Sequence, residues 1–355
     1  MKTKKALKIA LISLTSVILA IVLTLGGYVT YVFAAYYRLE DNITLDVDSA
    51  NEALSIPVGE EFRIVSYNIG FGAYSDDYTF FMDGGVESRC RSEQIGIDNV
   101  KGALSVATKA DADIYLFQEV DIDATRSYHV NQLDILKESL GGEFASVYAQ
   151  NYDSPYLFWP LLAPHGANKS GIATFSRFNV SSALRRQLPI EDGFMKLLDL
   201  DRCYSVSRIP CEGGRELVVY NVHLSAYTSD GTIANEQLKM LIADMQGEYD
   251  KGNYCIAGGD FNKDLPDDTG DADYTWAQPI PPELIPEDFT LIPPEADPIK
   301  SCRDAGVVYD ADTSFTITVD GFIVSDNVEV KASKVIDTGY KYSDHNPVYL
   351  DFILK

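Results

Sequence analysis

The chain has 355 residues, of which 46% are hydrophobic and 23% charged, enough for one large globular domain or two small ones. Its formal net charge is −24, and because residues 1–38 contain five basic groups and no acidic one, the remainder carries −29. A surface this acidic is poorly suited to binding the phosphate backbone of a nucleic acid by charge. The five cysteines include no C-x-x-C pair, which argues against a zinc site and indicates buried thiols.

The first 38 residues predict a single-pass membrane anchor. Four lysines precede an uncharged run from Ile9 to Tyr37, whose 29 residues exceed the roughly 20 that cross a bilayer as a helix. By the positive-inside rule, the basic residues predict an N-terminus in the cytoplasm and a body outside the cell membrane. The alternative is a cleaved signal peptide with its site at Val32-Phe33-Ala34 and a secreted product.

The body of the chain begins after an acidic, polar segment, residues 39–61, which is predicted to be a tether with room for an early edge strand. Alternating apolar and polar residues predict a first strand over 62–68, with Asn68 at its end. The apolar run 114–117 predicts a second, buried strand, and Glu119 follows it. Because a carboxylate at the exit of a buried strand is unfavourable unless it is paired or metal-bound, Glu119 is the best single candidate for a metal ligand.

The middle of the chain predicts alternating strands and helices. Further strands are expected at 144–148, 170–177, 203–210 and 216–224, the last two as a hairpin, and helices at 92–109, 131–140 and 237–249. The aromatic loop 151–168 is either a binding rim or a packed loop. Lys169 is one of the few basic groups near the candidate residues. Asn221 and His223 share a face of their strand, and because a lone strand histidine is more often a core residue than a catalyst, its role stays open.

The stretch Gly258-Gly259-Asp260-Phe261-Asn262 follows a short apolar run and has the strongest chemical signal. In an extended segment the side chains at i and i+2 point the same way, so Asp260 and Asn262 are expected to face one pocket. The first can take a proton and the second can donate hydrogen bonds. Taken alone, the stretch is more typical of a plain Asp/Asn/Gly turn, and only the other stretches change that weighting.

The last third contains an acidic, proline-rich insert, residues 264–299, with ten acidic residues, no basic one and eight prolines. It cannot form a long helix and is predicted to be an ordered lid or a solvated loop. Asp320 lies in a predicted strand pair over 313–325. Ser343-Asp344-His345 precedes the final strand.

These polar residues lie at or near strand ends, and they converge only if the strands form sheets whose ends share one pocket. Carboxylates, histidines and amides without a cysteine ligand set favour a hard cation such as Mg²⁺, with Mn²⁺ or Ca²⁺ as alternatives. The set is Asn68, Glu119, His223, Asp260, Asn262, Asp320, Asp344 and His345.

Seven short motifs, in this order, resemble those of the endonuclease/exonuclease/phosphatase superfamily, which includes deoxyribonucleases, apurinic endonucleases, neutral sphingomyelinases and inositol-polyphosphate 5-phosphatases. The motifs are Ser66-Tyr67-Asn68, Gln118-Glu119-Val120-Asp121, Ser170-Gly171-Ile172-Ala173-Thr174-Phe175-Ser176, Asn221-Val222-His223-Leu224, Gly259-Asp260-Phe261-Asn262, Asp320-Gly321-Phe322-Ile323 and Ser343-Asp344-His345. Each is weak alone, but their order is specific and covers 62–355. The resemblance implies an α/β fold, a four-layer sandwich of two mixed β-sheets flanked by helices, here preceded by one N-terminal transmembrane helix.

The resemblance also implies which residues bind a metal and which move protons. Glu119 would bind a divalent cation, with Asn68 close by and Asp344 supporting the metal side. His345 would contact the scissile phosphate or act as general acid or base, oriented by Asp320.

A second group of residues would hold the substrate and water. Asp260 would activate water or protonate the leaving group, while Asn262 and Asn221 would hold phosphate oxygens. His223 would be the second phosphate-facing histidine. Lys169 precedes the Ser-Gly motif, where many members have Asn or Tyr, and is a hypothetical phosphate contact.

Three functions are compatible with this pattern. The first is a surface-anchored phosphoesterase that acts on lipid head groups or small phosphate esters. The second is an extracellular nuclease, which the acidic charge argues against. The third is a catalytically silent binding module on the same scaffold, which the complete residue set argues against. No protein partner can be inferred.

Overall fold

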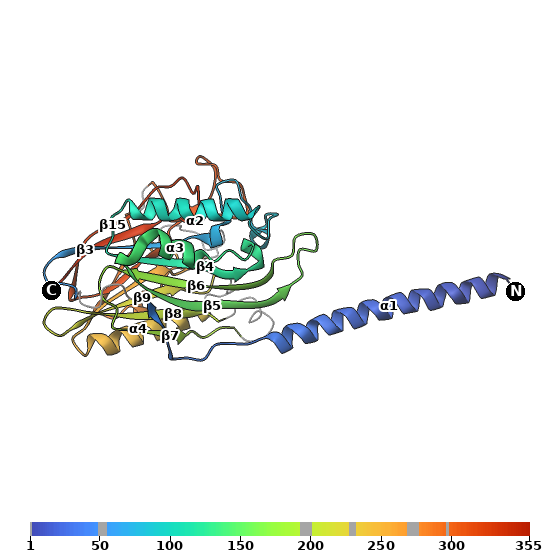
Figure 1. The fold of residues 1–355 in the computed structure, drawn as a ribbon, viewed down its shortest axis with the longest axis horizontal. Coiled ribbons are helices and arrows are strands. Elements are labelled where there is room, and N and C mark those ends of the chain that lie inside the picture. The colour runs from blue at the N-terminus through green and yellow to red at the C-terminus, as the bar shows by residue number, and fades with distance from the viewer. Residues whose placement is uncertain (1, 49–54, 192–200, 227–231, 268–276, 296–297) are drawn as a thin grey trace. The chain divides into compact units, whose positions relative to one another are not determined.

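The computed structural model describes residues 2–48, 55–191, 201–226, 232–267, 277–295 and 298–355 (Figure 1). The chain forms two compact units, with the boundary between Tyr37 and Arg38. The first unit is helix α1 (Lys2–Ala35), whose stretch Thr3–Ala35 has a mean hydropathy of 2.5 and is long and apolar enough to span a membrane. This confirms the predicted apolar helix, and its length and composition fit a membrane anchor and a signal sequence alike.

The second unit is built on two seven-stranded mixed sheets. The first sheet has the spatial order β1 (Ile43–Thr44), β7 (Ser182–Gln187), β8 (Cys203–Pro210), β9 (Glu216–His223), β10 (Tyr254–Asp260), β14 (Asp320–Ser325) and β11 (Phe289–Ile292). The second sheet has the order β15 (Val328–Val335), β16 (Val348–Leu354), β3 (Glu61–Asn68), β4 (Ile114–Ala124), β6 (Gly166–Ser176), β5 (Ala145–Leu157) and β2 (Val47–Asp48). Only β9–β10 and β3–β4 are parallel among these pairs.

The two sheets pack face to face, and helices cover their outer faces. Ile64 and Leu116 of one sheet share a core cluster with Val219 and Ile256 of the other. The helices are α2 (Glu93–Thr108), α3 (Gln132–Leu140) and α4 (Thr232–Tyr249). Residues of α2 and α3 share a second core cluster with the outer face of the second sheet, and α4 does the same for the first sheet. The result is a helix/sheet/sheet/helix arrangement, which confirms the predicted four-layer sandwich (Figure 1).

Local sequence explains where several elements begin. Ser92 caps α2 by accepting a hydrogen bond from the backbone N of Ile95 at 3.2 Å, as serine commonly does at a helix N-terminus. In β10, Gly259 has φ +150°, and a Cβ at this position would lie 2.0 Å from the carbonyl oxygen of Val222 on β9. Glycine is therefore required for β10 to approach β9 at the point where Asp260 leaves the sheet.

The predicted tether, 39–61, and the acidic insert, 264–299, both contribute strands to the sheets. The described residues of 39–61 supply β1 and β2, which pair with β7 and β5 and so extend an edge of each sheet. The acidic insert 264–299 contributes β11, which pairs with β14, and a short 3₁₀ helix, Pro282–Leu284. Residues 268–276 and 296–297 of this insert lie outside the described residues. A two-stranded ribbon of β12 (Cys302–Arg303) and β13 (Thr316–Ile317) borders the site described next.

Candidate active site

A pocket of about 300 Å³ lies at the end of the sandwich where β3, β9 and β10 terminate and β14 begins. Two further predicted residues, Asn68 and Asp320, are buried and hydrogen-bond to the pocket-lining residues. The predicted residues that line it are Glu119, His223, Asp260, Asn262, Asp344 and His345. The structure therefore brings eight of the ten candidates together.

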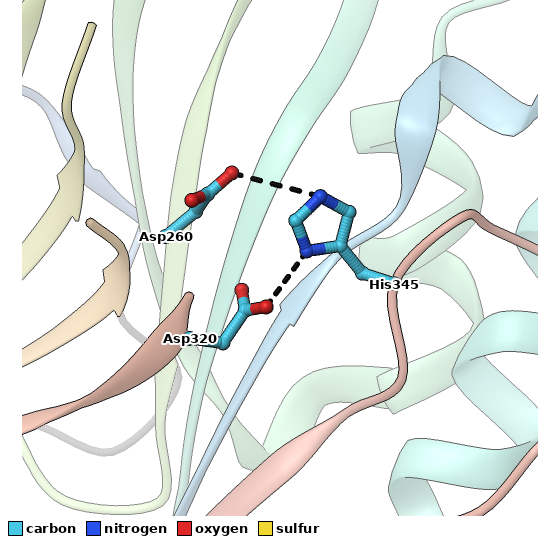
Figure 2. Close-up of side chains that lie close together, drawn as sticks. All are labelled: Asp260, Asp320 and His345. Carbon is cyan, nitrogen blue, oxygen red and sulfur yellow. Dashed lines mark hydrogen bonds and ion pairs between the residues drawn. The ribbon is translucent and has the colours of Figure 1, made fainter. Parts of the chain in front are cut away.

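His345 lies between two carboxylates, as Figure 2 shows. Its Nδ1 is 2.7 Å from Oδ2 of Asp320, and its Nε2 is 3.7 Å from Oδ2 of Asp260. All three side chains are buried. The short hydrogen bond holds the ring with Nδ1–H donated to Asp320, so Nε2 is the nitrogen directed at Asp260.

The pKa values of Asp260 and His345 are both raised, and His345 is the group that holds a proton at neutral pH. Burial raises the pKa of Asp260 to about 7; the Asp320 carboxylate adds to the rise and His345 opposes it. Burial lowers the pKa of His345, but the negative charges around it, Asp320 first, outweigh burial and hold its pKa well above the usual value. Near neutral pH the site thus has an imidazolium that can donate a proton and a carboxyl group that titrates, as general acid–base chemistry requires.

Asn68 links the proton-transfer group to Glu119. Its Nδ2 donates to Oδ2 of Asp260 at 3.0 Å and to Oε1 of Glu119 at 3.3 Å, while its Oδ1 accepts from the backbone N of Gly70 at 3.0 Å. Its donors thus face the two carboxylates, which Asn68 holds in this arrangement, and its oxygen faces the backbone N of Gly70.

Glu119 reaches the pocket through a β-bulge. Phe117 pairs with Ala173 and Val120 with Gly171, so β4 has one more residue than β6 across this interval. Glu119 adopts φ +55°, a left-handed conformation that costs roughly 1–3 kcal/mol outside glycine. Such bulges redirect a side chain, and this one directs Glu119 into the pocket although β4 continues to Ala124.

His223 lies between the carboxylates of Asp260 and Glu119. Its Nε2 lies 3.6 Å from Oδ2 of Asp260 and 4.0 Å from Oε1 of Glu119. Burial, followed by the positive charge of Arg202, lowers its pKa well below the usual value. His223 is therefore a neutral imidazole at pH 7, whereas His345 is charged.

Asn262 orients Asp260 from the turn that follows β10. Its backbone N donates to Oδ1 of Asp260 at 2.9 Å, and its Nδ2 donates to the carbonyl of Leu224 at 2.9 Å. Asn262 has φ +49°, a conformation that asparagine tolerates better than most residues. Asp260 and Asn262 thus both line the pocket, as predicted, and the hydrogen bond between them closes a turn rather than continuing the extended strand.

The acidic wall of the pocket fits a hard divalent cation. Glu119 and Asp344 both line it, and burial raises the pKa of Glu119, with Arg126 opposing the rise and Asp344 adding to it. A buried carboxylate beside a second one is a type of site that a divalent cation stabilises. Ligand atoms of Asp260, Asp320 and His345 also lie within 4.8 Å of one another. In that second group, the hydrogen bond to Asp320 already occupies Nδ1 of His345.

Two predicted residues, Asn221 and Lys169, neither line the pocket nor hydrogen-bond to the described residues that line it. Asn221 is fully buried between the sheets, where it accepts from Nε2 of Gln118 at 2.8 Å and donates to the carbonyl of Ala173 at 3.0 Å. Its polar atoms thus join the two sheets to each other. Lys169 is exposed and lies opposite Asp123 and Asp153 on the neighbouring strands.

Several pocket residues have no motif that identifies them from sequence. Tyr74 and Arg202 line the pocket from loops. Cys302 also lines it, with Sγ 3.6 Å from Nε2 of His345. Arg126 is buried, forms an ion pair with Asp121 at 2.8 Å and stacks on Phe71 at 3.9 Å from the ring centroid. The effect of the Arg126 charge on Glu119 can be recognised only from the folded structure.

Comparisons with known proteins agree with this geometry. The family model described as Endonuclease/Exonuclease/phosphatase family matches residues 65–345. A search of curated proteins finds no significant match.

Solved structures share the fold at low identity. An endonuclease/exonuclease/phosphatase from Beutenbergia cavernae is 17% identical, with a TM-score of 0.58, over 83% of this chain and 72% of that one. ANGEL2, a 2',3'-cyclic phosphatase, is 19% identical with a TM-score of 0.55, over 88% of this chain and 99% of that one. The human Nocturnin catalytic domain is 19% identical with a TM-score of 0.52, over 88% and 98%. The chain therefore belongs to the endonuclease/exonuclease/phosphatase family, whose members hydrolyse phosphoester bonds.

Proposed function

We propose that the protein is a membrane-anchored, extracytoplasmic phosphoesterase that depends on a divalent cation and hydrolyses phosphodiester or phosphomonoester bonds. The observation that carries this proposal is the pairing of His345 with Asp320 and Asp260 at a pocket that Glu119 and Asp344 also line. Hydrolysis of a phosphate ester needs a proton acceptor for water, a proton donor for the leaving group and positive charge for the phosphoryl oxygens. The pocket offers groups for all three.

The residues divide this work by their protonation states. Asp260, held by Asn68 and Asn262, accepts a proton from the attacking water when it is ionised. The His345 imidazolium donates a hydrogen bond or a proton from Nε2 toward the phosphate, while Asp320 keeps Nδ1 protonated. The neutral His223 contacts a phosphoryl oxygen without adding charge.

A cation would be held by Glu119 and Asp344, with Mg²⁺ as the first candidate and Mn²⁺ or Ca²⁺ as alternatives. When bound, it would polarise a phosphoryl oxygen and offset the negative charge of the substrate. Asn68 supports this site by fixing the Glu119 carboxylate, and Arg126 favours the ionised form of that carboxylate.

For the substrate, the acidic chain favours a small phosphate ester or a lipid head group over a nucleic-acid polymer. Arg202 and the buried Arg303 are the described cationic side chains that line the pocket together with its histidines. Because ANGEL2 is described as a 2',3'-cyclic phosphatase, a cyclic phosphodiester belongs among the substrates to be compared.

The test is hydrolysis of a panel by the purified full-length chain in detergent with Mg²⁺. The panel contains a chromogenic phosphodiester, a 2',3'-cyclic nucleotide, sphingomyelin, inositol phosphates and plasmid DNA. Turnover of at least one small or lipid ester, abolished by chelator, supports the proposal. Preferential cleavage of DNA would favour the nuclease instead, and no turnover of any ester would favour a silent binding module.

A further inference from the structure

An exposed apolar tip lies at the turn of the β5–β6 hairpin, and we define it as Tyr156–Leu162. In this turn Trp159 is 59% exposed, Leu161 is 66% exposed and Leu162 is 99% exposed. Its backbone is ordered by hydrogen bonds from Ala163 N to the Pro160 carbonyl at 3.1 Å and from His165 N to the Trp159 carbonyl at 3.2 Å. A fixed turn thus presents large apolar side chains to the surroundings, which is unusual for a soluble surface.

The composition of this hairpin differs sharply from that of the rest of the chain. Residues 154–168 contain no Asp, Glu, Lys or Arg, although 23% of the whole chain is charged. The hairpin also extends past β4, whose pairing with β6 reaches only Asn168 (Figure 1). An uncharged, protruding turn with Trp and Leu is the composition that enters the interface of a lipid bilayer.

The apolar tip is connected to the edge of the active-site pocket. His165, at the base of the turn, packs on the rings of Phe80 and Phe81 at 6.1 and 6.0 Å, and its Nδ1 lies 2.7 Å from the carbonyl of Ser88. The loop so fixed contains Asp83, which lines the pocket. It also exposes Met82 and Val86, the latter 80% exposed, and so adds apolar surface near the tip.

The start of the second unit lies at the same end of the sandwich. Arg185 donates to the carbonyls of both Glu40 and Gln150, at 3.1 and 2.9 Å, and β5 runs from Gln150 toward the apolar tip. The backbone N of Leu39 binds Asp201 at 2.9 Å, next to the pocket-lining Arg202. Since only Tyr36 and Tyr37 separate α1 from Arg38, a membrane-embedded α1 would keep Arg38 within roughly 11 Å of the bilayer.

We propose that the apolar tip inserts into the lipid bilayer beside the pocket and docks the catalytic unit on the membrane that holds α1. Resting on the proposed function, this docking selects phosphate esters of membrane lipids as substrates, because their head groups lie where the pocket opens. Because the chain is strongly acidic, electrostatic attraction to anionic lipids does not drive this contact. The contact is apolar, so it forms on zwitterionic phosphatidylcholine and is insensitive to salt.

The experiment uses the full-length chain reconstituted in phosphatidylcholine vesicles, with Trp159 as the reporter. The sequence has two tryptophans, so Trp276→Phe leaves Trp159 as the single emitter, and Trp159→Phe gives the matched background. Vesicles that contain brominated lipids are expected to quench the fluorescence of Trp159. Its emission maximum is expected at a shorter wavelength than that of a water-exposed indole that iodide can reach. Leu161→Asp/Leu162→Asp is expected to abolish this quenching, because it places two charges in the inserted turn.

A matched control adds the same charges at the other end of the hairpin strands. Ser181 and Ser182 are exposed and follow the far end of β6, and Ser181→Asp/Ser182→Asp should leave the quenching unchanged. In the same vesicles, Leu161→Asp/Leu162→Asp should lower the rate on a lipid phosphate ester and leave the rate on a soluble chromogenic ester unchanged. Melting temperatures of all variants verify that they are folded.

The outcomes separate this proposal from the proposed function. Unquenched Trp159 in reconstituted wild type overturns the docking proposal, whatever the activity. Trp159 that is shielded from iodide but not quenched by lipid, with cross-linking to a second copy or another protein, also overturns it. Lipid quenching without hydrolysis of any ester would uphold the docking surface and contradict the phosphoesterase.

Discussion

Replacing Asp320 by asparagine is the most informative single change at the site, because it removes a charge and preserves the shape. Asp320 accepts the Nδ1–H of His345 at 2.7 Å, and its negative charge is the main cause that holds the pKa of His345 above the usual value against burial. In Asp320→Asn, the largest contribution that opposes burial is removed, so the pKa of His345 falls and less imidazolium is present near pH 7.

The expected loss follows from the role of that proton. General acid–base catalysis contributes a factor of about 10²–10⁴, or roughly 3–5 kcal/mol of barrier, so kcat of Asp320→Asn should fall within this range. In the wild type, activity should rise as pH increases through about 7, where Asp260 ionises, and fall at the higher pH where His345 loses its proton. The substitution should move that upper limb to lower pH.

The assay is the pH dependence of kcat on a chromogenic phosphodiester, measured together with the melting temperature. A hydrogen bond to a charged group contributes roughly 1.5–3 kcal/mol, so the variant should remain folded. Asp351→Asn is the matched control, since Asp351 also forms a short ion pair, 2.6 Å from Nε of Arg63, but lies outside the pocket. Near-normal kcat and an unshifted upper limb in folded Asp320→Asn would refute the reasoning. A large fall in melting temperature would show that the pair only stabilises the fold.

Four further predictions concern the pocket residues and the N-terminal helix. His345→Ala should lower kcat by about 10² or more with a small change in melting temperature, and a folded variant with near-normal kcat would exclude the catalytic assignment. Glu119→Gln should weaken the response of activity to added Mg²⁺, measured as the cation concentration for half-maximal rate, and full activity in excess chelator would contradict it. Arg202→Ala should raise KM for an anionic ester more than it lowers kcat, and an unchanged KM would remove Arg202 from the substrate site. Fractionation and protease treatment of intact cells should find the chain in the membrane with its body accessible, whereas a soluble product beginning near Ala35 would identify a cleaved signal.

The strand-end residues were accessible to sequence reasoning because strand periodicity is simple. Asp260 and Asn262 follow an apolar run at spacing i and i+2, and the structure places both on the pocket wall. Asn221 shows the limit of the same rule. It shares a strand face with His223, but it lies two residues, or roughly 6.6 Å, earlier in β9 and is therefore still between the sheets.

Other features depend on contacts that periodicity does not encode. A single extra residue in β4 directs Glu119 into the pocket, and nothing in its sequence distinguishes this bulge from a regular strand. Lys169 precedes the Ser170–Ser176 motif yet is exposed to solvent. Arg202, Tyr74 and Cys302 reach the site from segments whose positions are set by the packing of the whole unit.

We propose above that this pocket hydrolyses phosphate esters with His345 as its proton donor. The most direct measurement is release of product from a chromogenic phosphodiester by the full-length chain with Mg²⁺, with His345→Ala assayed in parallel. We predict turnover by the wild type, its loss in chelator, and a rate at least about 10²-fold lower in the folded variant. Equal rates in the two proteins, or no product from the wild type with any ester of the panel, would contradict the claim.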